Sequence, residues 1–205
     1  MKLDAEDLEV YAGDKCRLPM VSFSLEDNEC AVLTGRSGGG KTTLLRVLAG
    51  LEKPTQGKVI YRSGKEEFTP EQLIKRGGLS LLFQENRLLP ELNAVENVRI
   101  IFHGEEKKDT ERITDELKKL LPDVETDRPV GLLSGGEQRR VACVRALIRD
   151  VPVILLDEPF TGLDEAACEA VRQYILQRSK DRTIIVVEHE AEHFTEWRNI
   201  SVEER

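Results

Sequence analysis

The sequence predicts an α/β protein in which a core of mixed sheet and helices carries an inserted helical piece. Three observations support this prediction. Short segments of strand character come first, the middle of the chain has the periodicity of helices, and strands then alternate with a helix. The chain has 205 residues, of which 40% are hydrophobic. This length suits one domain over residues 1–205, with a helical subdomain inserted at about 88–149.

The first strands are recognised by short apolar or alternating runs. Val21–Leu25 alternates, Cys30–Thr34 is a short apolar run, and Lys58–Tyr61 and Leu79–Phe83 have the same character. A helix is expected from Lys41 to about Ala49, between the second and third of these strands.

The middle of the chain is expected to be helical. A helical pattern runs from Ala94 to Leu121 with a charged break at Gly104–Asp109, and Pro122 stops it. Within the break, Glu105–Asp109 is expected to form a solvated turn between two helices. A further helix is expected from Gly136 to Arg149.

The last third alternates strand, helix and strand at Val153–Asp157, Glu165–Ser179 and Thr183–Val187. Both strands are apolar and rich in β-branched residues, with no alternation. Such runs are typical of parallel strands that are buried on both faces.

Composition excludes several classes of function. The net charge of −8 and the pI of about 5.1 disfavour general nucleic-acid binding, since an acidic surface repels phosphate backbones. No apolar run approaches the roughly 18 residues of a membrane span, so membrane association is expected to come through a partner. None of the four cysteines forms a CxxC pair, so the spacing indicates neither a zinc site nor a dithiol redox motif.

A glycine-rich loop is the first motif that carries chemistry. It matches G-x-x-x-x-G-K-[ST], follows an expected strand and opens an expected helix. Glycines let the backbone wrap closely around phosphate oxygens, and the helix start adds partial positive charge. Lys41 is expected to reach the β- and γ-phosphates, and the Thr42 hydroxyl to ligate Mg²⁺. The loop and the residue after it are Gly35, Arg36, Ser37, Gly38, Gly39, Gly40, Lys41, Thr42 and Thr43.

Two acids end the apolar strand at Val153–Asp157. In α/β sheets ligands bind at this carboxyl edge, so Asp157 is expected to hold Mg²⁺ and Glu158 to face the attacking water. An ordinary strand end would explain the pair if it stood alone. The pair gains weight because it lies downstream of a phosphate loop.

A second motif is Leu133-Ser134-Gly135-Gly136-Glu137-Gln138-Arg139-Arg140. A serine and two glycines at a helix start form a second anion-binding end, whereas one ATP already has its phosphate loop. The sequence therefore suggests a site completed by a second copy of the chain. Ser134 and Glu137 also have the spacing of a capping box, and both interpretations can hold together.

This motif closely resembles the signature sequence of ATP-binding-cassette (ABC) ATPases, and the resemblance covers almost the whole chain. Gly35–Thr42 is similar to the Walker A loop and Val153–Glu158 to Walker B. The resemblance implies a P-loop NTPase core with an N-terminal antiparallel β subdomain and an inserted helical subdomain. Asn28 stands where the family usually has Gly before the Walker A strand, and Asn also tolerates a turn.

The resemblance also implies roles for individual residues. Gln84 matches the Q-loop glutamine, which contacts Mg²⁺ or its water. Gly162-Leu163-Asp164 matches the D-loop, in which Asp164 links the two sites of a dimer. Glu158 matches the general base, and His189 the switch histidine that holds the γ-phosphate and water. The catalytic set is therefore Glu158, His189, Lys41 and Gln84, and the metal set is Thr42, Gln84 and Asp157. Tyr11 would stack on adenine, and the residues that contact ATP from the second protomer would be Ser134, Gly135, Gly136 and Glu137.

Each role has a simpler alternative. Gln84 could be a solvated loop residue, His189 an ordinary histidine at a strand end, and Tyr11 a packing aromatic.

The resemblance implies an ATPase subunit that powers transport, with ATP and Mg²⁺ as ligands. Its partners would be a second ATPase copy or a related ATPase, and a membrane permease docked near Gln84–Glu91 at the cytoplasmic face. Phe83–Pro90 with Ala94–Val98 is similar to nitrate, sulfonate and taurine importers, whereas the compact length is similar to the haem-export ATPase. Lipoprotein and peptide exporters have similar domains, so the direction stays open. The alternative from another class is a soluble ABC ATPase, such as one of iron–sulfur cluster assembly.

Overall fold

The computed structural model describes residues 1–102, 106–125, 127–189 and 191–202. It divides into two compact units. The first unit comprises residues 1–81, 151–157 and 179–205, and the second comprises residues 82–150 and 158–178.

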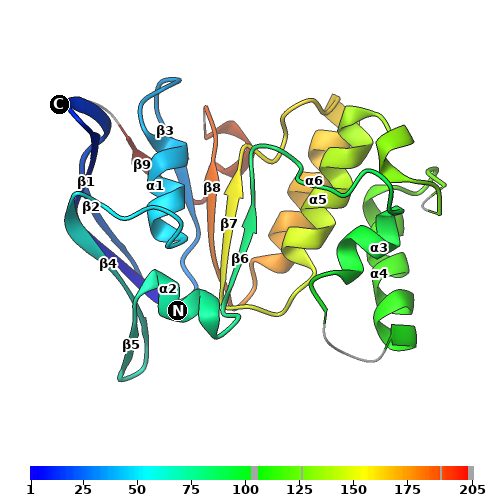
Figure 1. Ribbon diagram of the computed structural model, residues 1–205, viewed down its shortest axis with the longest axis horizontal. Helices are drawn as coiled ribbons and strands as arrows, with labels where there is room; N and C mark the ends of the chain where they lie inside the picture. Colours follow the sequence, from blue (N-terminus) through cyan, green and yellow to red (C-terminus); the bar gives the residue numbers. More distant parts are fainter. Residues whose placement is uncertain (103–105, 126, 190, 203–205) are drawn as a thin grey trace. The chain divides into compact units, whose positions relative to one another are not determined.

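Two sheets build the first unit (Figure 1). The antiparallel sheet has the strand order β2-β1-β4-β5, with β1 at Lys2–Ala12, β2 at Lys15–Leu25, β4 at Gln56–Ser63 and β5 at Glu66–Phe68. The other sheet has the order β6-β7-β8-β3-β9, and its pairs β7–β8, β8–β3 and β3–β9 are parallel. Its strands are β3 (Ala31–Thr34), β6 (Leu79–Leu82), β7 (Val153–Asp157), β8 (Thr183–Val187) and β9 (Arg198–Ser201).

Helix α1 (Lys41–Leu48) contacts β2 of the first sheet and both β7 and β8 of the second. Its buried leucines belong to one hydrophobic core with Leu8 of β1 and Leu155 of β7. Every residue of β7 and β8 is buried, which confirms the prediction of buried parallel strands. The core thus fixes the strand ends and the start of α1, where the phosphate loop lies.

The second unit is a group of helices that pack on one another (Figure 1). They are α3 (Ala94–Arg99), α4 (Glu106–Leu120), α5 (Gly135–Leu147) and α6 (Glu165–Arg178), with a 3₁₀ turn at Val130–Leu132. Helix α4 buries Ile113, Leu117 and Leu120, which recur at helical spacing along one face. Among the residues that the structure describes, no helix is both long and apolar enough to cross a membrane.

The α/β fold class is confirmed, but some elements differ from the prediction. The solvated turn at Glu105–Asp109 is wrong from residue 106 onward, because α4 begins at Glu106; Glu105 itself lies outside the described residues. The amphipathic pattern that starts at Ile113 extends back through charged residues that are good helix formers.

Several further elements had no prediction. Strand β1 is rich in acids and is interrupted by shifts in register near Asp7, whose φ is 47°, so its pairing with β2 and β4 overrides weak strand propensity. Helix α2 (Pro70–Lys75) carries a capping box between Thr69 and Gln72, a pattern that the sequence does show. The short strand β9 and the 3₁₀ turn at Glu192–Phe194 complete the first unit.

Candidate nucleotide site

The phosphate loop joins β3 to α1. Gly35 has φ 142°, and a Cβ there would lie 2.3 Å from the Val202 carbonyl oxygen, so only glycine fits. Gly40 has φ 97° and caps α1. The Nζ of Lys41 donates to the carbonyl oxygens of Gly35 (2.7 Å) and Arg36 (3.1 Å), so the chain curls around its own ammonium group. Lys41 is only 5% exposed, and its charge is thus held at the centre of the loop.

Thr42 and Asp157 meet within the first unit. The Thr42 hydroxyl lies 3.3 Å from Oδ1 of Asp157, which joins the first turn of α1 to the end of β7. A hydroxyl and a carboxylate are hard oxygen ligands of the kind that Mg²⁺ prefers. The two side chains therefore fit a magnesium ion.

Glu158 has an uncommon backbone. Its φ is 47°, a left-handed conformation that is uncommon for residues other than glycine. Its Oε2 accepts from the Thr161 hydroxyl at 3.3 Å and lies 3.5 Å from Nε2 of Gln84. The two candidate catalytic side chains Glu158 and Gln84 are thus brought together in the second unit. Backbone strain of this kind is concentrated at functional sites.

The signature serine caps α5. Oγ of Ser134 accepts from the Glu137 amide at 3.3 Å, and Oε2 of Glu137 accepts from the Ser134 amide at 2.6 Å. The capping box is therefore confirmed. Hydrogen bonds from the Ser134 backbone and side chain lower the pKa of Glu137 and keep it ionised.

A pocket in the second unit gathers the signature, Q-loop and D-loop residues. Ser134, Gly135 and Gly136 line it together with Gln84 and Asp164. Oδ1 of Asp164 accepts from the Ala167 amide at 2.8 Å and thereby caps the start of α6. The pocket thus brings together residues that are 80 positions apart in the chain, from Gln84 to Asp164.

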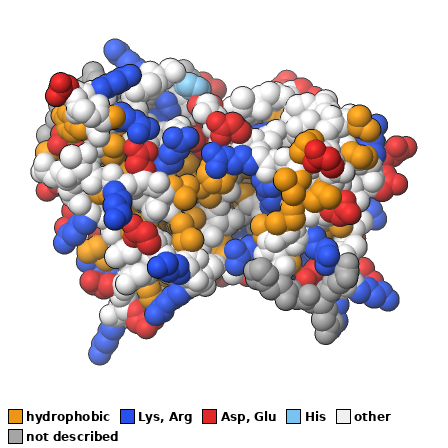
Figure 2. Space-filling view, in the orientation of Figure 1, with side chains coloured by type: hydrophobic (Ala, Val, Ile, Leu, Met, Phe, Trp, Pro, Cys, Tyr) orange, Lys and Arg blue, Asp and Glu red, His pale blue; other side chains and the backbone are white. Residues whose placement is uncertain are grey.

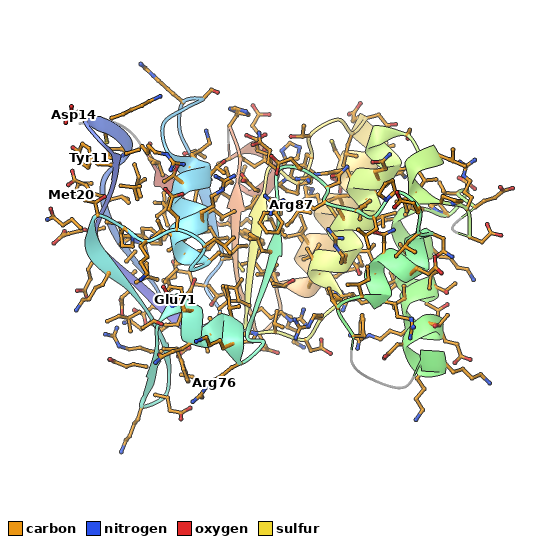
Figure 3. The ribbon with its side chains drawn as sticks, viewed as in Figure 1. Tyr11, Asp14, Met20, Glu71, Arg76 and Arg87 are labelled. Atoms are coloured by element: carbon orange, nitrogen blue, oxygen red, sulfur yellow. The ribbon has the colours of Figure 1, made fainter. Side chains whose placement is uncertain are left out.

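His189 and Tyr11 belong to the first unit. His189 is exposed and comes two residues after β8, where the Glu188 amide still bonds to Leu33 of β3. Tyr11 is 44% exposed near the turn between β1 and β2, beside which Asp14 lies (Figure 3). The stacking of Tyr11 on adenine stays a prediction. Asn28 has φ 63°, which confirms that it forms the tight turn before β3.

Sequence reasoning missed two arginines of α5, Arg139 and Arg145. Both guanidinium groups bond to backbone carbonyls of the segment that follows β6. A buried arginine cannot be recognised from periodicity, because charged residues normally mark the solvated face of a helix.

The phosphate loop, the paired oxygen ligands and a second glycine-rich helix start define a nucleoside triphosphatase of the cassette type. Comparison with known proteins agrees, and the chain belongs to the ABC transporter family, whose model matches residues 18–161. It is an ATP-binding and ATP-hydrolysing member of this family.

Similar proteins come from several branches of the family. The chain is 35% identical to the cytochrome c biogenesis ATP-binding export protein CcmA of Gluconobacter oxydans, over 91% of this chain and 81% of the relative. It is 37% identical to the lipoprotein-releasing system ATP-binding protein LolD of Hydrogenovibrio crunogenus, over 92% and 87%. A dimeric ATP-binding cassette solved with ADP and Pi after hydrolysis has a TM-score of 0.83 at 28% identity, over 98% of this chain and 94% of that one. The likeness to nitrate-type importers stays a prediction.

Proposed function

We propose that this chain powers transport through a membrane permease by binding ATP between two copies of the cassette. The observation that carries the proposal is that one chain contains two glycine-rich helix starts, at Gly40–Lys41 of α1 and at Ser134–Gly136 of α5, and such positions suit anions. One ATP needs a single phosphate loop, so the second helix start would serve the nucleotide of a partner copy. The dimeric state of the similar solved cassette supports this arrangement.

In each site the phosphate loop would bind the phosphates of ATP. Lys41 would exchange its bonds with the Gly35 and Arg36 carbonyls for phosphate oxygens, and loop amides from Gly35 to Thr43 would donate to the same anion. Thr42 and Asp157 would hold Mg²⁺, which would supply positive charge against the phosphate oxygens, and Gln84 is the further proposed ligand. Tyr11 would stack on the adenine ring from the first unit.

Hydrolysis would depend on Glu158, whose carboxylate would accept a proton from the attacking water. His189 would hold the γ-phosphate and this water, and Asp164 would connect the two sites across the dimer. Ser134, Gly135, Gly136 and Glu137 would complete the site of the partner copy, with the cap of α5 keeping the helix start rigid.

The permease would dock on the second unit near Gln84–Glu91. Leu89 is 49% exposed within that segment, and Ile100 and Leu132 of the same unit are 52% and 70% exposed. Burial of these apolar side chains against a partner would be favourable, which supports the proposed docking. The cassette would thus lie on the cytoplasmic face of the membrane, with residues 88–149 as the helical subdomain that moves the permease. Names of the similar proteins include both export and import, so the proposal covers transport in either direction.

Acidic and basic side chains are interspersed on the face drawn in Figure 2. The net charge of −8 disfavours general binding of nucleic acid, and the absence of such a role stays a prediction.

The test of the base is Glu158→Gln. We expect ATP turnover to fall by about a hundredfold or more, which is typical for loss of a general base, while ATP drives the variant into a stable dimer. Turnover is measured by phosphate release, and dimerisation by size-exclusion chromatography with and without ATP. Glu66→Gln, at an exposed acid of β5, is the matched control and should behave as the parent. Parental turnover in Glu158→Gln would refute the assignment.

The test of the phosphate loop is Lys41→Ala, for which we expect ATP affinity to fall because the buried ammonium is removed. Affinity is measured by titration calorimetry. Unchanged affinity would contradict the role of Lys41. Coupling to transport is tested by reconstituting the chain with a co-purified permease in vesicles. ATPase activity that ignores the permease would favour the soluble alternative.

A further inference from the structure

We propose that Arg139 is a positioning residue for Glu158, and that it links the geometry of this carboxylate to the segment 83–86 that follows β6. The inference rests on the proposed function in that Glu158 is taken as the base. It assigns a role to a residue of α5 whose hydrogen bonds reach the backbone of Glu158 and of the segment 83–86.

The Arg139 guanidinium is buried in the second unit and reaches two segments at once. Its Nη1 donates to the carbonyl oxygens of Phe83 (2.7 Å) and Gln84 (3.2 Å) and to Oδ1 of Asn86 (3.2 Å). Its Nη2 donates to the carbonyl oxygen of Glu158 at 2.8 Å. Arg139 is 2% exposed. Burial of a charge is costly unless it is hydrogen-bonded, so these carbonyl contacts keep the side chain in one place.

Glu158 has a backbone conformation that needs such support, since its φ is 47°. A left-handed conformation is costly for a residue other than glycine, and it persists only where the surroundings hold it. Pro159 follows, and a residue before proline has fewer backbone conformations to choose from. The bond from Nη2 holds the carbonyl oxygen of Glu158, and with it the direction in which the side chain leaves the backbone.

The same guanidinium holds the backbone of Gln84. The side chains of Gln84 and Glu158 lie 3.5 Å apart, between Nε2 and Oε2, and their carbonyl oxygens share Arg139 as donor. A displacement of the segment 83–86 would therefore move the Arg139 guanidinium, which is planar and rigid, and with it the backbone of Glu158. The planar fork of arginine is suited to this task, whereas lysine presents a single point charge.

Arg145, which follows Arg139 along α5, provides a matched comparison. Its guanidinium donates to the carbonyl oxygens of Asn86 (2.7 Å) and Arg87 (2.9 Å), and Arg87 lies on the segment after β6 (Figure 3). These two bonds hold Asn86, at the end of the segment 83–86, and Arg87 directly after it, and neither bond reaches Glu158. Substitution of Arg145 loosens the segment, and substitution of Arg139 loosens both the segment and Glu158.

The experiment is a double-mutant cycle on the full chain. Arg139→Met is made in the parent and in the Glu158→Gln variant, and kcat and KM for ATP are measured by phosphate release. We expect kcat to fall about tenfold in the parent with KM changed less than about twofold, since contacting residues couple at this level. In the Glu158→Gln variant the same substitution should change the residual rate less than about twofold, because no carboxylate remains to position. Arg145→Met should lower kcat by no more than about threefold.

Two further measurements separate positioning from a general structural role. ATP affinity by titration calorimetry should be unchanged in Arg139→Met, and hydrogen exchange at residues 83–87 and 158–161 should be faster. Arg139→Lys should recover part of kcat, and it replaces Arg139→Met throughout the cycle if the latter does not fold.

An unchanged kcat in Arg139→Met, or an equal proportional loss in both backgrounds, would overturn the inference. Parental turnover in Glu158→Gln alone would instead overturn the proposed base.

Discussion

Asn97 offers the sharpest test of how the second unit holds the segment near the proposed docking site. Its side chain is fully buried. Nδ2 donates to the carbonyl oxygens of Leu89 (3.0 Å), Leu92 (3.1 Å) and Asn93 (3.0 Å), and Oδ1 accepts from the Leu89 amide at 2.8 Å. A single residue of α3 therefore ties down the loop that precedes its own helix.

The magnitude follows from these contacts. An amide group has two hydrogens, so three carbonyl partners share two donated bonds, and the accepted bond makes three in total. Asn97→Ala removes all three bonds and leaves buried backbone groups without partners. At about 1 kcal/mol for each bond, with part of the desolvation cost added, we expect the free energy of unfolding to fall by about 3 kcal/mol.

The assay is urea unfolding followed by circular dichroism, with the midpoint and slope compared between variants. Asn199→Ala is the control, because Asn199 is an exposed asparagine that accepts one bond from Thr34; it should cost less than about 1 kcal/mol. Asn97→Asp should destabilise at least as much as Asn97→Ala, since a carboxylate would face three carbonyl oxygens. A loss below about 1 kcal/mol in Asn97→Ala would refute the reasoning.

Two further predictions concern the phosphate loop and the helical unit. Gly35→Ala should abolish ATP binding and lower the free energy of unfolding by about 2 kcal/mol or more, because its Cβ would lie 2.3 Å from a backbone carbonyl oxygen. Gly13→Ala is the control, since Gly13 has φ 61° and open space around it. This variant should lose about 1 kcal/mol and keep ATP binding. Burial alone would raise the pKa of Glu116, but hydrogen bonds from Lys119, Tyr174 and Arg178 and the charge of Arg178 lower it to about 2. The stabilisation that ionised Glu116 gives to the fold is therefore complete above the unfolded pKa near 4.5, and it is lost as the pH falls toward 2. Glu116→Gln should lower the free energy of unfolding at pH 7 by about 2–3 kcal/mol. It should also make the free energy of unfolding depend less steeply on pH below pH 4.5. Chemical unfolding at several pH values measures the free energy of unfolding of both proteins. The same pH dependence in Glu116→Gln as in the parent would contradict the prediction.

The sequence pattern alone predicts those helices and strands in which buried residues recur at regular spacing. Strands β7 and β8 and helices α1, α5 and α6 were predicted because apolar runs and helical spacing express burial directly. Strand β1 was not, because its pairing partners β2 and β4 come later in the chain and compensate for its acidic residues and its irregular register. The start of α4 was misplaced because charged residues suit both a solvated turn and a solvated helix face.

The sequence by itself determined the chemistry of this protein, since a phosphate loop and a signature motif need particular residue types at fixed spacing, and those are visible in one dimension. Only the tertiary structure decided how the side chains between these motifs are used. It placed the Arg139 guanidinium against the Glu158 carbonyl and the Asn97 amide against the backbone of Leu89, because hydrogen bonds of buried polar groups join segments that are remote in the chain or that turn back on themselves. The sequence shows which polar residues are present, whereas the folded structure determines which of them form hydrogen bonds with one another.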